Sequence, residues 1–416
     1  MLFEQLVHSL FTEAKKLVPR KPQFYPFLPI IHEIKFFNDL WIMDNRVKNL
    51  WELENWPKFS WHIEELKPKL DNIRLLQGRL LGKLDDLPAS FEHQAQVDIL
   101  VENVMRNRGV ENQMLTLESF LLSVGNSAVE TQTTTEIEQE PIGSLLNLWI
   151  NITQNYREPV SQEQLGVWHT ALFAHQVDPQ LNKYCVPNYE QMAQYSIQGF
   201  TTEEINYEPP TKSTMNLELL GFLHWFNHRS EGIDGLLRAG IAHLWFMALK
   251  PYKNGNGRMA RVLTDLALAQ TESESIKYYS FSSVISGNRN FYNKCIANAL
   301  TGNLCITEWL VGFLTMLEES ILQGISRINH FMRKTRYWQK HSQTLLNARQ
   351  LKLLNDLLNV KENNEEDTAN INASKYMNIT RVSEATATRE LTDLLEKHCL
   401  RKLPGGGRST TYVIAR

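Results

Sequence analysis

Two glycines and two arginines surround an asparagine in the most informative stretch of this sequence. Gly255 and Gly257 have no Cβ, so the backbone around them can turn successive N–H groups toward one anion. The helix predicted to begin near Gly257 adds the positive end of its dipole. Arg258 and Arg261 are three residues apart and share one helical face, where paired guanidinium groups suit a polyphosphate. The spacing predicts an anion site around Asn256, but a helix–helix turn with two surface arginines explains these residues alone equally well.

The elements that must position this loop are predicted to be helices. The preceding segment, 232–249, is apolar on nearly every side, which is typical of a helix buried at the centre of a bundle. Apolar residues three and four apart predict further helices at 61–84, 217–227 and 306–341. Alternation typical of strands occurs only at 195–207 and in the last dozen residues. The predicted fold class is therefore mainly α.

The whole chain has the composition of an ordinary folded protein. Its 416 residues, 43% hydrophobic and 21% charged, suffice for two or three domains, and a net charge of -3 gives no general attraction to nucleic acid. The four cysteines form no C-x-x-C pair, which argues against structural zinc and disulfides and favours the reducing cytoplasm. No secretory signal is visible and the apolar run 24–31 is too short for a bilayer, so no membrane contact is expected. Export into a host by a specialised system would leave no mark that these rules detect.

The sequence from His243 to Arg261 resembles the signature of the Fic family, H-P-F-x-[DE]-G-N-G-R-x-x-R. The matching residues are Pro251, Gly255, Asn256, Gly257, Arg258 and Arg261, with Tyr252 in the position of the phenylalanine. Other stretches resemble the Fic subgroup with a helical N-terminal domain and a C-terminal winged helix. They are Trp56-Pro-x-Phe-x-Trp61, Gln77-Gly-Arg-Leu-Leu-Gly82, Tyr279-Ser-Phe-Ser-Ser283, Ala385-Thr-Ala-Thr-Arg389 and Gly405-Gly-Gly-Arg-Ser-Thr410.

This resemblance implies a Fic-type helical bundle with a small β-hairpin flap, followed by a winged helix-turn-helix. It implies an N-terminal helical domain over 50–130, the Fic domain over 140–340 and the winged helix over 345–416. Residues 1–49 are unmatched and rich in aromatic side chains. They either pack on the core or mediate a homodimer.

The family also implies a ligand and roles for the loop residues. Its members mostly transfer AMP from ATP to a protein hydroxyl, so ATP is the expected ligand. Asn256 and the backbone of Gly255 and Gly257 would hold the α- and β-phosphates. Arg258 would also contact phosphate, and Arg261 would meet the γ-phosphate.

Two loop residues depart from the family signature where the chemistry is done. Lys250 replaces the histidine base, and Asn254 replaces the carboxylate that binds Mg²⁺. A lysine titrates near ~10.4, so a base at pH 7 needs a fall in pKa of roughly three units, about 4 kcal/mol. A neutral amide is also a poorer Mg²⁺ ligand than a carboxylate. The sequence therefore predicts nucleotide binding with little need for Mg²⁺, no metal held by the protein, and weak or absent transfer.

Three functions remain open at this point. The first is an unconventional or reversible AMP transferase. The second is a DNA-binding regulator without enzymatic activity, built on an inactive Fic scaffold. The third is a structural remnant that has lost both roles.

Two further segments have counterparts in the family. The segment 107–112 resembles an inhibitory helix, and Glu111 would pair with Arg261 and block the γ-phosphate; a surface glutamate at a frayed helix end is the alternative. The segment 200–207 lies where the family has a flap that aligns a protein target by strand addition.

The last 45 residues are predicted to bind double-stranded DNA. Ser383 can cap a helix over 384–398, whose first turn would present side chains to bases, and a basic hairpin follows it. From Asn372 to Arg416 there are eight Lys and Arg against four Asp and Glu, a local charge of +4. This excess favours phosphate contact, with protein–protein contact as the alternative. The predicted DNA-binding residues are Thr386, Thr388, Arg389 and Arg408.

Overall fold

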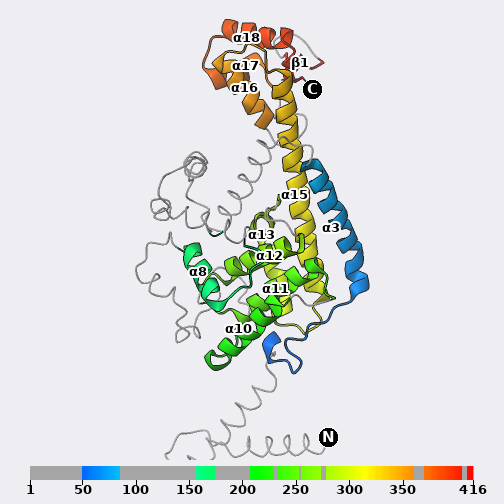
Figure 1. Cartoon of the computed structure of the whole chain (residues 1–416). Helices are drawn as coiled ribbons and strands as arrows, with labels where there is room; N and C mark the ends of the chain where they lie inside the picture. Colours follow the sequence, from blue (N-terminus) through cyan, green and yellow to red (C-terminus); the bar gives the residue numbers. More distant parts are fainter. Residues whose placement is uncertain are drawn as a thin grey trace, which may run out of the picture. The chain divides into compact units, whose positions relative to one another are not determined.

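The computed structural model shows a mainly helical protein, as the sequence predicted (Figure 1). It describes residues 49–84, 148, 155–173, 207–228, 232–252, 254–272, 278–359, 370–404 and 410–415. The predictions for the N-terminal extension, for Glu111, for the flap before Tyr207 and for Arg408 lie outside these ranges. Within them, no helix combines the length and the apolar character needed to cross a membrane. The described cysteines, Cys295, Cys305 and Cys399, are free thiols.

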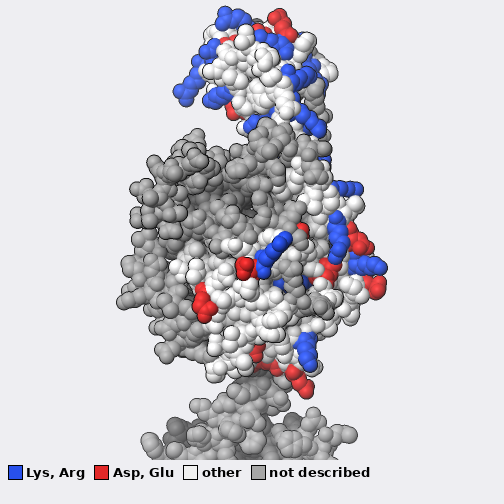
Figure 2. Space-filling view, viewed as in Figure 1, with Lys and Arg blue, Asp and Glu red and all other residues white. Residues whose placement is uncertain are grey.

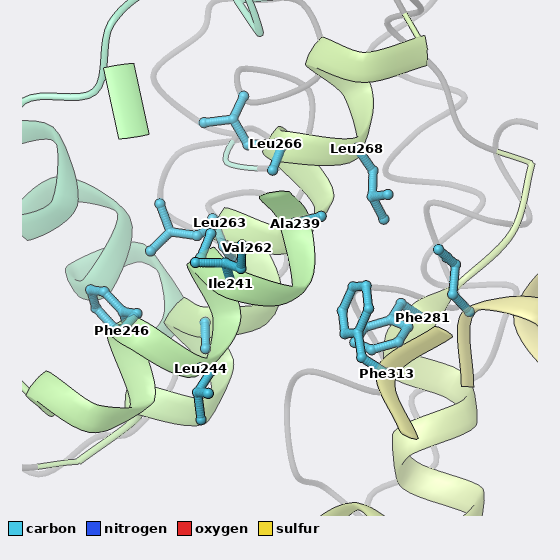
Figure 3. Close-up of a cluster of buried hydrophobic side chains, with 14 of the residues drawn as sticks. Ala239, Ile241, Leu244, Phe246, Val262, Leu263, Leu266, Leu268, Phe281 and Phe313 are labelled. Carbon is cyan, nitrogen blue, oxygen red and sulfur yellow. The ribbon is translucent and has the colours of Figure 1, made fainter. Parts of the chain in front are cut away.

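Helix α11 (Gly235–Leu249) is the buried centre of the larger hydrophobic core, as its apolar sequence predicted. It begins later than the predicted residue 232 because Asp234 caps it, accepting a hydrogen bond from the Leu236 N–H at 2.9 Å. Helices α10 (Lys212–Asn227) and α12 (Asn256–Glu272) pack against it. Figure 3 shows side chains of α11 and α12 meeting in this cluster, with Phe281 and Phe313 next to each other.

Helix α15 (Thr307–Lys340) crosses α11 at unusually close range. A Cβ on Gly240 would lie 2.9 Å from a methyl carbon of Leu310, so only glycine permits this approach. The Trp309 indole N–H donates to the Gly240 carbonyl at 2.9 Å, which fixes the crossing point. Helices α13 (Phe281–Gly287) and α14 (Arg289–Leu300) also pack on α15.

The N-terminal part of the described chain attaches to this core through aromatic rings. After the short helix η1 (Leu50–Glu52), Trp56 and Phe59 meet Trp245 of α11 edge-on, with ring centroids 5.9 and 5.8 Å apart. The Trp56 indole N–H donates to the Glu218 carboxylate at 2.9 Å. The Trp-Pro-x-Phe-x-Trp stretch therefore anchors the chain against α10 and α11.

Helix α3 (Ile63–Leu84) lies along α15 and buries the apolar stripe that predicted it (Figure 1). The buried residues are Leu66, Leu70, Ile73, Leu76, Leu80 and Leu84, whereas Ile63 at the start of the helix is 46% exposed. Polar contacts fix α3 to the end of the α11–α12 hairpin that lies away from the loop. Arg74 forms an ion pair with Asp234, and the Gln77 amide donates to Glu272 at 2.5 Å.

The residues 348–415, called the C-terminal module below, form a second hydrophobic core. Its helices are α16 (Ala348–Asn359), α17 (Ala373–Thr380) and α18 (Glu384–Glu396), followed by the strands β1 (Leu400–Lys402) and β2 (Tyr412–Ile414). The strands pair antiparallel, with Leu400 opposite Ile414, and Ile371 forms a bridge to Tyr412. The core also takes in Tyr337 near the end of α15, so it begins before the boundary predicted at residue 345.

Several local predictions for this module need correction. Helix α16 was not predicted, although Leu353, Leu354 and Leu357 are buried in the core. Helix α17 continues to Thr380 and ends at Arg381, which adopts a left-handed conformation with φ 55°. Ser383 caps α18 as predicted, but the helix ends at Glu396 rather than at residue 398.

Candidate functional site

The motif loop (residues 250–257, of which residue 253 is not described) joins α11 to α12. Lys250 ends α11 in a left-handed conformation with φ 47° and ψ 58°, and its N–H donates to the Phe246 carbonyl at 3.0 Å. Gly255 has φ 82°, which glycine adopts without strain. The first intrahelical hydrogen bond of α12 joins the Met259 N–H to the Gly255 carbonyl at 2.9 Å. The helix therefore presents its first N–H groups, and the positive end of its dipole, at the loop.

Asn256 braces the loop with its side chain. Its Oδ1 accepts a hydrogen bond from the Tyr252 N–H at 3.0 Å, and its Nδ2 donates to the Tyr252 carbonyl at 2.6 Å. Both ends of the amide are thus engaged with the backbone of the same loop. A contact from this side chain to phosphate, which the resemblance implied, would have to compete with that bracing.

His169, on helix α8 (Gln162–Phe173), belongs to the site and was missed by the sequence reasoning. Its Nε2 lies 2.9 Å from the Asn254 carbonyl oxygen, and because a carbonyl only accepts, Nε2 is the donor. The imidazole also stacks on Tyr252, with ring centroids 4.1 Å apart and planes 12° apart. Burial lowers the pKa of His169. A histidine beside Trp168, with Leu165 and Leu172 at helical spacing, was the available signal that the helix packs with this side inward.

Burial lowers the pKa of three cationic side chains of the loop and α12. The Lys250 ammonium lies 4.7 Å from the centre of the Tyr207 ring, and burial lowers its pKa to about 8. Burial and the charge of Arg261 lower the pKa of Arg258 to about 10. Burial also lowers the pKa of Arg261, although Tyr292 and Asp265 oppose that shift.

The positions of the two arginines follow from α12. One guanidinium nitrogen of Arg261 would lie 3.9 Å from a Cβ on Gly257, so the side chain runs beside the first turn of the helix. Arg258 reaches the other way, and its Nη1 donates to the Leu172 carbonyl of α8 at 3.4 Å. The two predicted phosphate-binding arginines therefore lie at the same helix end as the motif loop.

A chain of buried, uncharged polar groups, formed by Thr264, His243 and Tyr292, lies near Arg261. Thr264 donates to the Ala260 carbonyl at 2.7 Å, so its hydroxyl oxygen accepts from Nδ1–H of His243 at 2.8 Å. The His243 Nε2 then accepts from the Tyr292 hydroxyl at 2.8 Å. Burial, with a contribution from the Arg261 charge, lowers the pKa of His243 to about 3. This histidine is therefore uncharged and structural, and it adds no positive charge to the site.

The described residues do not fit a magnesium ion held by the protein. Asn254, which stands where the family has a carboxylate, is exposed and uncharged. In the described ranges no three His, Cys, Asp or Glu side chains come together as a metal site. The predicted pairing of Glu111 with Arg261 lies outside these ranges and stays a prediction.

Three of the four predicted DNA-binding residues lie on the first half of α18. Thr388 and Arg389 are exposed, whereas Thr386 is half-buried and its hydroxyl lies 3.0 Å from that of Ser383. Figure 2 shows Lys and Arg side chains around much of the visible surface of the C-terminal module. Glu390, which follows Arg389, is instead turned inward and buried.

Comparison with known families identifies two segments of the chain. Residues 159–268 match the Fic/DOC family, which covers α8 to α12 and the whole motif loop. Residues 49–127 match a domain of unknown function, DUF4172. The resemblance to Fic proteins stated from the sequence is thus confirmed for the segment that carries the loop.

Solved structures of Fic proteins resemble the chain at low sequence identity. A Fic family protein from Desulfovibrio desulfuricans is 16% identical, with a TM-score of 0.48 over 86% of this chain and 98% of that one. A signalling protein with a Fic domain from Bacteroides thetaiotaomicron is 14% identical, with a TM-score of 0.45 over 63% of this chain and 96% of that one. Fic-1 from C. elegans is 16% identical, with a TM-score of 0.42 over 62% and 72% of the two chains. Likeness at this level assigns neither an activity nor a ligand to this chain.

Proposed function

We propose, on the premise that residues 159–268 form a Fic/DOC family domain, that the motif loop binds the polyphosphate of a nucleotide, with ATP as the expected ligand. In this proposal Lys250 acts as a positive charge and not as a base, and transfer of AMP to a protein hydroxyl is weak or absent. A full transferase and a DNA-binding regulator without transfer are the competing functions.

The observation that carries the proposal is that burial lowers the pKa of basic side chains in the motif loop and the first turns of α12. Lys250 and Arg258 both have pKa values lowered by burial, which means that their charged forms are held there at a free-energy cost. In the described part of the chain Lys250 makes no ion pair, and its recorded contact is the face of Tyr207. A polyphosphate at the N-terminus of α12 would bring negative charge to this loop and favour the charged forms of both side chains.

The same numbers argue against efficient base catalysis by Lys250. With a pKa of about 8, about a tenth of the lysine is neutral at pH 7. A bound polyphosphate would stabilise the ammonium and reduce that fraction further. In addition, Asn254 stands where the family has the carboxylate that binds Mg²⁺. Lys250 would therefore take over part of the metal's charge while leaving the target hydroxyl without a base.

Calorimetric titration of the full chain with ATP, with and without Mg²⁺, tests nucleotide binding. We expect similar affinity in both conditions, and weaker binding by Lys250→Met. Lys294→Met is the matched control because that lysine is exposed on α14. Absence of heat from ATP in both conditions would overturn the proposal.

Incubation with labelled ATP then separates binding from transfer. We expect labelled protein from the double variant Lys250→His/Asn254→Asp, which restores both family residues, and little or none from the native chain. Strong labelling by the native chain would instead establish the transferase and show that Lys250 serves as a base.

DNA binding by the C-terminal module is the second candidate function. It is supported by the capped helix α18 with exposed Thr388 and Arg389, by the hairpin after it, and by the local charge of +4. We expect duplex DNA to bind the native chain and to bind Arg389→Ala/Arg408→Ala more weakly, whereas Glu396→Ala on the same helix should bind at least as well. Equal binding by the arginine variant would remove this face as the DNA reader. Docking of a protein target on 200–207 and a homodimer through 1–49 stay predictions.

A further inference from the structure

Three carbonyl groups of the motif loop accept hydrogen bonds from donors around it. The Tyr252 carbonyl accepts from Nδ2 of Asn256, the Asn254 carbonyl from His169, and the Gly255 carbonyl from the Met259 N–H. This arrangement matters because a peptide unit points its carbonyl and its N–H in opposite directions. A loop that directs N–H groups at an anion must direct its carbonyls elsewhere, and those carbonyls need partners.

His169 differs from the other two donors. Asn256 and Met259 are neighbours in sequence, whereas His169 reaches the loop from α8, 85 residues away along the chain. The carbonyl that it holds belongs to the Asn254–Gly255 peptide, which is the easiest peptide in the loop to turn over. Gly255 is at φ 82° and, lacking a Cβ, tolerates the opposite sign of φ as well.

We propose that His169 is a positioning residue, which locks the Asn254–Gly255 peptide so that its N–H faces the anion site and its carbonyl faces α8. The proposal rests on the proposed function, since the anion is the polyphosphate of the nucleotide. When the lock is absent, the peptide turns over and its carbonyl oxygen is presented to the phosphates. The site then loses a charge-assisted hydrogen bond and gains a repulsive dipole.

Stacking and burial hold the imidazole itself in place. It stacks on Tyr252, whose backbone is clasped by Asn256, and it is 7% exposed. The adjacent Arg258 donates to the Leu172 carbonyl, one turn further along α8, so the helix meets both the loop and the first turn of α12. The imidazole of His169 is therefore held rigidly on α8, and its hydrogen bond restrains the peptide next to the flexible Gly255.

Two substitutions separate the effect of the hydrogen bond from His169 to the Asn254 carbonyl from the effect of its stack on Tyr252. His169→Gln keeps a side-chain N–H that can reach the Asn254 carbonyl but cannot stack in the same way, whereas His169→Phe keeps the stack and removes the donor. A hydrogen bond from a backbone N–H to a charged group contributes about 1.5–3 kcal/mol, which corresponds to roughly a ten- to hundredfold change in affinity. We expect His169→Phe to weaken ATP binding by that factor, with an unchanged thermal midpoint, and His169→Gln to keep most of the native affinity.

The control for these variants is His224→Phe, which replaces an exposed histidine on α10 and should bind ATP like the native chain. Native affinity in His169→Phe would overturn the lock. Equal losses in His169→Phe and His169→Gln would overturn it too, because the stack and not the hydrogen bond would then matter.

A second set of measurements needs no nucleotide. Nitrogen NMR of the native chain should show His169 as the Nε2–H tautomer, and exchange of the Gly255 amide should differ between the native chain and His169→Phe without ATP. The Nδ1–H tautomer would overturn the proposal, because that form cannot donate to the Asn254 carbonyl. If ATP fails to bind the native chain while these signatures are present, the proposed function fails and the lock on the loop stands.

Discussion

Two clusters of charged side chains in this protein have opposite electrostatics. In the C-terminal module, Glu390 of α18 accepts hydrogen bonds from Arg349, from Asn347 at 3.1 Å and from the Tyr376 hydroxyl at 2.5 Å. These neighbours lower the pKa of Glu390, with the Arg349 hydrogen bond as the main cause, and Glu390 in turn raises the pKa of Arg349. Each charge in this cluster is stabilised by its surroundings.

The motif loop shows the reverse. Lys250, Arg258 and Arg261 have the same sign of charge, and burial lowers the pKa of each. Their surroundings disfavour the charged forms that these residues must adopt near neutral pH. The difference teaches how to separate a structural cluster from a binding site. A buried group whose charge is favoured serves the fold, whereas basic groups whose charged forms are disfavoured by burial are candidates for a binding site.

The largest expected effect is a loss of stability in the cluster around Glu390, whose charges are favoured by their neighbours. Glu390→Ala removes the buried acceptor that joins α16, α17 and α18 and leaves the Tyr376 hydroxyl without its partner, which we expect to cost about 3 kcal/mol. Hydrogen exchange in α17 and α18, with denaturant unfolding, measures the loss. Glu396→Ala on the exposed side of α18 should change stability by less than about 0.5 kcal/mol. Equal effects of the two substitutions would contradict the comparison.

The second effect has the opposite sign. Lys250→Met removes a charge that the fold disfavours, so we expect the free energy of unfolding at pH 7 to rise by about 2 kcal/mol. The folded pKa of about 8 lies below that of an unfolded lysine, so the penalty is full below pH 8 and disappears as pH rises toward ~10.4. Denaturant unfolding between pH 7 and 10 should therefore show a rise in native stability that Lys250→Met lacks. The exposed Lys294→Met is the control, and a loss of stability in Lys250→Met would place Lys250 among the structural charges.

The third effect concerns the ligand and its pH dependence. If a polyphosphate binds the motif loop, binding favours the Lys250 ammonium, so affinity is greatest below pH 8 and falls above it, by up to about tenfold per pH unit. Calorimetry with ATP from pH 7 to 9.5 measures this fall and the accompanying proton uptake. Lys250→Arg stays charged throughout and should give a flatter profile. An identical slope in that variant would assign the titration to another group.

The smallest effect tests one contact of the cluster around Glu390. Tyr376→Phe removes the hydroxyl that donates to Glu390 but leaves Arg349 and Asn347 in place, and we expect a loss of about 1 kcal/mol. Thermal unfolding of the module against Tyr412→Phe, a half-buried tyrosine in β2, gives the comparison. No measurable loss would mean that the remaining donors satisfy the carboxylate without Tyr376.

The sequence predicted the features that depend on neighbouring residues. The burial of α11, the start of α12 at the glycines and the Ser383 cap each follow from periodicity or from a short-range hydrogen bond. It did not predict contacts between distant segments, because spacing along one helix says nothing of what packs against it. His169 shows no sign in the sequence that it meets the Asn254 carbonyl. Glu390 looks like any surface glutamate of an amphipathic helix until Arg349 and Tyr376 are placed around it.

The way α3 and α15 enclose the α11–α12 hairpin limits how this protein can be cut. The Fic/DOC match ends at residue 268. It therefore leaves out Glu272, to which Gln77 donates a hydrogen bond, and Leu310 of α15, which packs against Gly240. A fragment of residues 159–268 would keep every residue of the motif loop and still present the apolar surface of α11 to water, which favours aggregation. A recombinant piece meant to carry a working loop should begin before Trp56 and extend through the end of α15.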